Sequence, residues 1–174
     1  MQIPMQVYSA DGELIAQYGE KRRIPVTLQQ MPPELIKAFI ATEDSRFYEH
    51  HGVDPVGIFR AASVAMFSGH ASQGASTITQ QLARNFFLSP EKTITRKIKE
   101  VFLAIRIEQL LNKDEILDLY LNKIYLGYRA YGVGAAAQVY FGKSVDQLTL
   151  SEMAVIAGLP KAPSTFNPLY SRSE

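Results

Sequence analysis

The chain has 174 residues, of which 47% are apolar and 20% charged, a composition typical of a folded globular domain and not of a disordered segment. A formal net charge of +1 gives no general affinity for polyanions, so no nucleic-acid partner is expected and any anion site must depend on local positive charge. The lack of cysteine excludes disulfides and thiolate metal sites.

The chain begins with a hairpin pattern and continues as a series of helices. Two short strands are predicted within residues 6–19, around the turn signal Asp11-Gly12. A helix opens at Pro32-Pro33-Glu34 and is predicted to reach about Tyr48. Further helices are predicted from about Thr77 to Phe87, Thr93 to Leu111, Asn112 to Leu126 and Thr149 to Pro160. The pattern indicates a mainly α domain with a small N-terminal β-hairpin.

The first predicted helix carries an acid on its apolar side. Leu35, Phe39, Glu43 and Phe47 recur every four residues, so Glu43 falls within the apolar arc. A carboxylate there loses hydration, which disfavours its charged form and makes it a candidate catalytic group. The alternative is that Glu43 turns outward or meets a cation. Asp44 lies toward the polar edge and is interpreted as structural.

The helix predicted at residues 93–111 carries a second acid among cations. Arg96 and Glu100 are neighbours one turn apart, and the simplest interpretation is a self-sufficient ion pair. Because this helix is apolar on nearly every side, we expect it to lie centrally, with protein on both sides. More positive charge lies nearby than one carboxylate needs, which suits a phosphate or pyrophosphate. The cations are Arg84, Lys92, Arg96, Lys97 and Lys99.

Two other segments have alternative interpretations. Residues 74–81, GASTITQQ, place hydroxyls and amides at a helix start, which suits a phosphate or a sugar, although Ser76 or Thr77 could act only as the helix cap. Residues 56–69 are nearly all apolar or small, so they form either core or a surface that enters a membrane interface. No metal site is predicted, because the adjacent His50 and His51 have no third ligand spaced nearby.

Five segments, in order, resemble the motifs of the family 51 peptidoglycan glycosyltransferases, the polymerising domains of class A penicillin-binding proteins. They are EDSRFYEHHG at 43–52, GASTITQQLARN at 74–85, RKIKE at 96–100, ILDLYLNKIYLG at 116–127 and LSEMAVIAGLPKAP at 150–163. The resemblance covers about residues 30–168. Arg84 stands where the family commonly has lysine, and it keeps a cation that can grip phosphate.

The resemblance implies a lysozyme-like, two-lobed α fold. Residues 1–28 would be a β-hairpin and linker, 29–168 the glycosyltransferase domain, and 169–174 the start of a linker to a missing downstream domain. The implied reaction joins lipid II units into β-1,4-linked glycan strands, with inversion and release of polyprenyl pyrophosphate. Glu43 would be the general base toward the acceptor 4-hydroxyl. The leaving pyrophosphate would be held by Glu100 together with Arg84, Lys92, Arg96 and Lys97, and the further donor contacts would be Ser76, Thr77, Gln80, Gln81 and Asn85.

The resemblance also implies partners and a location. Lipid II and the growing glycan chain would be bound at the periplasmic face of the bacterial inner membrane, with residues 56–69 against the membrane surface. A transmembrane anchor and a transpeptidase domain are expected in the full-length protein. No cofactor is required by the sequence, although a divalent cation, Mg²⁺ or Mn²⁺, has a place at the pyrophosphate. A lysozyme-like glycan hydrolase or lytic transglycosylase, which needs no pyrophosphate site, and an inactive glycan-binding homologue are the alternatives.

Overall fold

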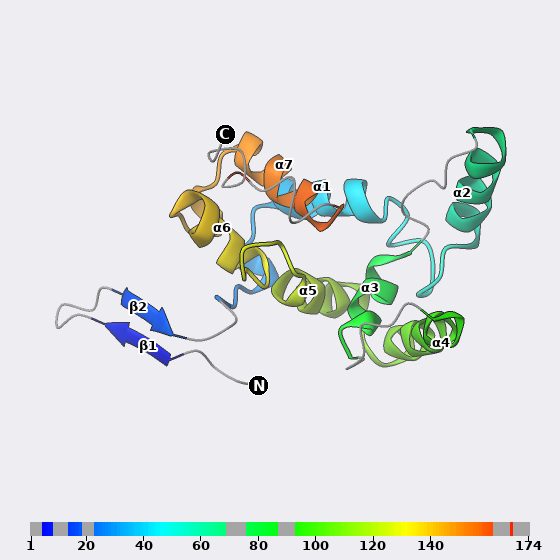
Figure 1. Cartoon of the computed structure of the whole chain (residues 1–174), viewed down its shortest axis with the longest axis horizontal. Coiled ribbons are helices and arrows are strands. Elements are labelled where there is room, and N and C mark those ends of the chain that lie inside the picture. The colour runs from blue at the N-terminus through cyan, green and yellow to red at the C-terminus, as the bar shows by residue number, and fades with distance from the viewer. Residues whose placement is uncertain are drawn as a thin grey trace. The chain divides into compact units, whose positions relative to one another are not determined.

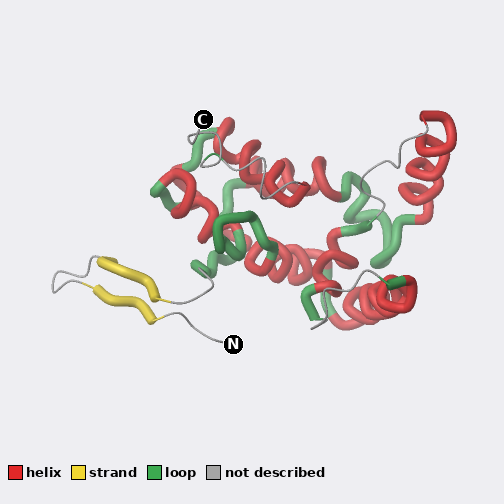
Figure 2. Tube along the Cα trace, in the orientation of Figure 1, coloured by secondary structure: helices red, strands yellow, loops and turns green. Residues whose placement is uncertain are grey.

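The computed structural model describes residues 5–8, 14–18, 23–68, 76–86, 93–161 and 168, and within them helices dominate (Figures 1 and 2). The mainly α class predicted from the sequence is therefore confirmed. The chain forms two compact units, one of residues 1–36 and 121–174 and the other of residues 37–120. Within the described ranges, every helix is too short or too polar to span a bilayer.

The first unit contains the predicted hairpin. Strands β1 (Met5–Tyr8) and β2 (Leu14–Tyr18) pair antiparallel, with Met5 opposite Tyr18 and a register irregularity after Val7 (Figure 1). The predicted Asp11-Gly12 turn lies outside the described residues. The same unit holds the short 3-10 turns η1 (Leu28–Gln30), η2 (Val145–Gln147) and η3 (Leu159–Lys161), together with helices α6 (Val133–Phe141) and α7 (Leu150–Gly158).

Helix α6 was not predicted, because its run of small residues has no amphipathic period. Close packing explains it instead: a Cβ on Gly134 would strike the carbonyl of Ile24, so only glycine lets the helix lie against that segment. Gly142 ends the helix in the left-handed region at φ 64°. Next to α6, Asn122 pairs with the Val26 backbone by accepting its N–H at 2.9 Å and donating to its carbonyl at 2.8 Å.

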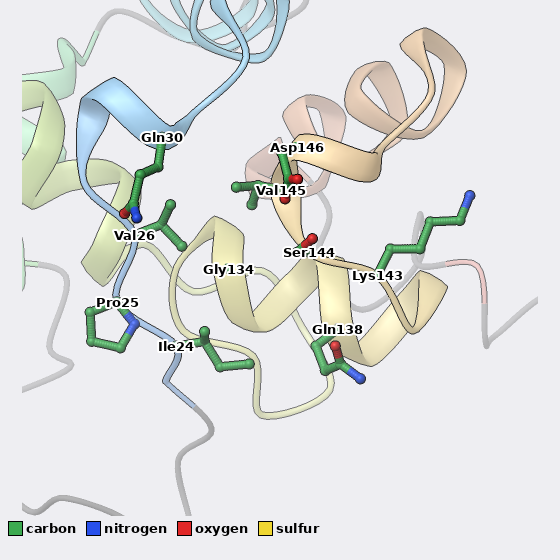
Figure 3. Close-up of a pocket in the computed structure, with 10 residues that line it drawn as sticks. All are labelled: Ile24, Pro25, Val26, Gln30, Gly134, Gln138, Lys143, Ser144, Val145 and Asp146. Carbon is green, nitrogen blue, oxygen red and sulfur yellow. The ribbon is translucent and has the colours of Figure 1, made fainter. Parts of the chain in front are cut away.

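Where α6 meets this N-terminal segment, the first unit has a cavity of about 500 Å³ (Figure 3). Its walls are largely aliphatic, and Lys143 and Asp146 add charge. No residue predicted to act in catalysis or substrate binding lines it. The cavity is lined by Ile24, Pro25, Val26, Gln30, Gly134, Gln138, Lys143, Ser144, Val145 and Asp146.

The second unit holds most of α1 (Pro33–Glu43) and of α5 (Lys113–Lys123), and all of α2 (Pro55–Ser68), α3 (Ile78–Arg84) and α4 (Ile94–Leu110). Helix α3 packs against α4. The segment before α2 approaches α4 closely, because Gly52 has a φ of 87° and a Cβ there would lie 3.0 Å from the Ala104 carbonyl.

Three helices end earlier than predicted, and one of them is α3, which stops at Arg84 and not at Phe87. Helix α1 stops at Glu43 and not at Tyr48, since the buried Asp44 side chain binds the Ile78 N–H and His50, and the chain turns through the following residues. Asp44 is therefore not on a polar edge, although its role is structural as expected. Helix α5 stops at Lys123 and not at Leu126.

The expectation that α4 is a central helix is wrong. Glu100, Ala104 and Ile107 are buried on one side of the helix, but Ile94 and Phe102 on the other are largely exposed. No element of the described chain covers that second side. The apolar periodicity reported the presence of two apolar faces correctly, but it could not show whether both faces are covered by protein.

Candidate active site

Glu43 is the last residue of α1, where its carboxylate meets an amide. Its Oε2 accepts a hydrogen bond from Gln81 Nε2 at 2.9 Å, and Gln81 Oε1 in turn accepts from the Tyr120 hydroxyl at 3.1 Å. The other oxygen, Oε1, is buried and has no hydrogen-bond partner among the described residues. Glu43 is half-buried, so it does not turn fully outward, and no salt bridge joins it to a described residue.

Tyr120 completes this chain of hydrogen bonds from the middle of α5. It is fully buried and its ring packs edge-on against Phe39, with the centroids 6.3 Å apart. Burial raises the pKa of the Tyr120 hydroxyl well above its ordinary value, and the charges of Glu43 and Asp44 raise it further. Tyr120 was not predicted as a site residue, although its place in the motif ILDLYLNKIYLG at 116–127 could have indicated it.

Glu100 lies at the centre of the predicted cationic cluster. Its side chain is 1% exposed, and three cationic nitrogens lie 3.3 Å from it: Arg84 Nε and Arg96 Nε at Oε1, and Lys97 Nζ at Oε2. This is a formal excess of two positive charges around one buried carboxylate. The side chains of Arg84 and Lys97 are nearly half exposed, at 48% and 46%, so they remain accessible to a bound anion. The predicted fifth member of this group, Lys92, lies outside the described residues.

Helix α3 provides side chains that bind both acids, Glu43 and Glu100. Gln81 binds Glu43 and Arg84 binds Glu100, and these two α3 residues are three positions apart. That spacing places them on one face of the helix, separated by about 4.5 Å along its axis. The carboxylates of α1 and α4 therefore engage the same side of α3, one with a neutral amide and the other with cations.

The start of α3 shows which of its predicted contacts are engaged within the protein. Thr77 Oγ1 accepts the Gln80 N–H at 3.1 Å, Gln80 Oε1 accepts the Thr77 N–H at 3.0 Å, and Thr77 Oγ1 also donates to the Gly52 carbonyl at 2.6 Å. Thr77 and Gln80 are buried, so the cap interpretation holds for Thr77. Ser76 Oγ accepts from Lys97 Nζ at 2.8 Å and joins the cationic cluster, while Asn85 is exposed at the other end of the helix. Their contacts to substrate stay predictions.

The donor set of this site does not suit a resident divalent cation. Among the described residues, no three acidic or histidine side chains gather as metal ligands. Glu100 offers one carboxylate, and the three cations around it would repel a metal ion. His50 Nε2 is engaged by Asp44, with its two contacts at 2.9 and 2.8 Å. The arrangement fits an anion and not a protein-held metal.

Helix α2 decides between the two interpretations of residues 56–69. Large apolar side chains along it are exposed, above all Phe59, Met66 and Phe67, at 76%, 81% and 87%. The core alternative is therefore wrong, and the described part of the segment presents an apolar surface.

Comparisons with known proteins place the chain in a family. A family model described as "Transglycosylase" matches residues 11–174. The chain is 92% identical over 171 residues to "Penicillin-binding protein 1A" of Escherichia coli (strain K12), covering 98% of this chain and 20% of that protein. It is 74% identical to the protein of the same name in Vibrio cholerae, covering 98% of this chain and 21% of that one.

A crystal structure of penicillin-binding protein 1A from Haemophilus influenzae is 44% identical, with a TM-score of 0.52, and the match covers 99% of this chain and 16% of that chain. The chain thus spans about a fifth of the length of the curated relatives that it matches. The matched family model, the relatives and the shared fold agree with the five motifs. The chain belongs to the transglycosylase family.

Proposed function

We propose that this chain polymerises lipid II into β-1,4-linked glycan strands, with inversion at the anomeric carbon and release of polyprenyl pyrophosphate. The observation that supports this most strongly is the pair of acids on one side of α3. Glu43 is bound by the amide of Gln81, whereas Glu100 is surrounded by Arg84, Arg96 and Lys97. Two acids in such different settings suit two tasks, proton removal and stabilisation of an anionic leaving group.

In the proposed reaction, Glu43 is the general base. Its carboxylate takes the proton of the acceptor 4-hydroxyl while the hydroxyl oxygen attacks the anomeric carbon of the donor. The bond between that carbon and the pyrophosphate oxygen breaks, and its electron pair leaves with the pyrophosphate. Attack from the face opposite the leaving group inverts the configuration from α to β.

The leaving pyrophosphate is stabilised by the cationic cluster. Arg84 and Lys97 are accessible and already oriented by Glu100. They can therefore bind the developing negative charge without a change of side-chain conformation. Arg96 and, from the sequence, Lys92 add to this field. Because the donors around Glu100 suit an anion, every proposed step uses side chains of this chain and none uses a metal.

The proposal extends to the surroundings of the domain. The apolar surface of α2 would rest in the membrane interface, where the polyprenyl tail of lipid II also lies. This agrees with action at the periplasmic face of the inner membrane. Since the relatives are about five times longer than the matched segment, an anchor and a transpeptidase domain in the full-length protein belong to the same proposal.

The direct test supplies lipid II in detergent and measures glycan product for the unaltered chain and for Glu43→Gln. The variant keeps the shape of the side chain but cannot take a proton, so polymer should disappear while lipid II binding stays within a few fold. Glu34→Gln changes an exposed acid of the same helix and is the matched control, with unchanged product. Turnover by Glu43→Gln would show that Glu43 is not the general base. Shortening of preformed glycan without use of lipid II would favour a hydrolase.

A further inference from the structure

The Gln81 side chain lies between an acid and a phenol, and this fixes which way its amide faces. A carboxylate can only accept hydrogen bonds, so the Gln81 group that faces Glu43 must be the Nε2 donor, at 2.9 Å. The Gln81 Oε1 then faces Tyr120, whose hydroxyl must donate, at 3.1 Å. The direction of the chain is therefore Tyr120 to Gln81 to Glu43 whenever Glu43 is ionised.

The two oxygens of Glu43 are unequal as a result. Oε2 is occupied by Gln81, whereas Oε1 is buried and has no partner among the described residues. An amide that faced the other way would set its oxygen against the carboxylate.

We propose that Tyr120 is a positioning residue of the transfer reaction: its hydroxyl holds the Gln81 amide so that Gln81 Nε2 binds Oε2 of Glu43 and keeps the carboxylate of the base in place. The inference deepens the proposed function and rests on Glu43 being the base. Tyr120 itself touches neither the substrate nor the reacting atoms.

The surroundings of Tyr120 fit this role. The ring is fully buried against Phe39, and phenylalanine would fill the same space, so packing alone gives no reason for the hydroxyl. The raised pKa of Tyr120 keeps the hydroxyl protonated, and so a donor, throughout the neutral range. Among the described residues, the charges that act on the Tyr120 hydroxyl are those of Glu43 and Asp44, and Asp44 is bound to His50.

The test compares Tyr120→Phe in the full chain with the unaltered chain, by steady-state polymerisation of lipid II. Loss of the hydroxyl lets the Gln81 amide turn, so kcat should fall on the order of tenfold, less than the hundredfold that a 1 Å misplacement of a catalytic group can cause, while KM changes little. The pH dependence of kcat should shift as well, because the hydrogen bond to the base is disturbed. An unchanged kcat and pH profile would overturn the inference.

The matched control is Tyr140→Phe in the first unit. Tyr140 is also buried, burial raises its pKa to about 12, and its hydroxyl donates to the Leu126 carbonyl at 2.7 Å. Removing that hydroxyl should lower the melting temperature and leave kcat unchanged. An equal loss of kcat in both variants would mean that Tyr120 acts only through stability, against the inference.

Coupling between residues separates positioning through Gln81 from a direct effect. In a Gln81→Leu background, the further change Tyr120→Phe should have no added effect on kcat, whereas additive losses would overturn the inference. If Tyr120→Phe does not fold, Gln81→Leu alone carries the test: it should lose kcat with KM little changed, and full kcat would refute the role. Activity remaining in Glu43→Gln would instead contradict the proposed function itself.

Discussion

Asp44 holds His50 through both carboxylate oxygens, at 2.9 and 2.8 Å from His50 Nε2, and one of these oxygens also accepts the Ile78 N–H at 3.0 Å. The two side chains are 3% and 2% exposed. This contact ties the residue after Glu43 to the first residue of α3. The positions of Glu43 and of Gln81, three residues beyond Ile78, are thus fixed by one buried pair.

Breaking that pair should destabilise the domain strongly. Asp44→Asn leaves His50 without its carboxylate partner in a buried place, and the expected loss in the free energy of unfolding is about 1.5–3 kcal/mol, the contribution of a hydrogen bond to a charged group. Denaturant unfolding measures it. The control is Glu49→Gln, whose carboxylate pairs with Arg46 at 2.7 Å but is 62% exposed, so its effect should stay within about 0.5 kcal/mol. Equal losses in the free energy of unfolding would show that the Asp44–His50 pair stabilises the fold no more than an exposed ion pair does.

The cations around Glu100 should affect use of the donor more than stability. Arg84→Ala and Arg96→Ala each remove one charged contact to the pyrophosphate, worth about 1.5–3 kcal/mol, so kcat/KM for lipid II should fall by about tenfold or more. Inhibition by inorganic pyrophosphate should weaken in parallel. Lys99→Ala is the matched control, because Lys99 is an exposed cation of the same helix without a described ion pair to Glu100. If melting temperatures moved while kinetics did not, the cations would be structural.

These helix starts could be predicted from the sequence because capping hydrogen bonds are local. Thr93 accepts the Arg96 N–H, and Thr149 and Glu152 form the predicted capping box. Each of these hydrogen bonds joins residues three positions apart. The end of α1 could not be predicted in the same way, since it depends on the contact between Asp44 and Ile78, residues 34 positions apart. Helix α6 was not predicted for a similar reason, because it packs against Ile24, which lies far from it in the sequence.

The same distinction between local and distant contacts decides which features of the site could be predicted. The pairing of Arg96 and Glu100 was predictable from their spacing on one helix. The link from Tyr120 to Gln81 joins residues 39 positions apart, and no local pattern reports it. Periodicity also could not decide whether the apolar residues of α2 and α4 are buried, because core helices and surface helices with an apolar face share the same pattern.

The ion pair between Lys143 and Glu152 should make stability depend on acid pH. The Lys143 hydrogen bond, followed by the backbone N–H of Thr149, lowers the pKa of Glu152 below its ordinary value. A lowered folded-state pKa contributes stability above the unfolded pKa, and this is lost as the pH falls from about 5 through the folded value. Glu152→Gln should therefore flatten the pH dependence of the melting temperature in that window. Lys143→Met removes the largest cause and should flatten it similarly, and parallel pH curves for all three chains would contradict the linkage.

The exposed face of α2 should bind lipid surfaces. Replacing Phe59, Met66 and Phe67 together by serine removes three largely exposed apolar side chains, so the fold should be unaffected while partition onto lipid vesicles falls. Full burial of one such side chain in the interface contributes about 1.5–3 kcal/mol. The partition coefficient should therefore fall by about tenfold or more for each side chain that enters the membrane fully. Co-sedimentation with vesicles of bacterial phospholipids measures this. Leu150→Ser, on α7, removes an apolar side chain that is 70% exposed, and it should leave partition unchanged. If the triple variant bound vesicles as well as the unaltered chain, the membrane surface would have to lie elsewhere, and α2 would need a protein partner to account for its exposed aromatic residues.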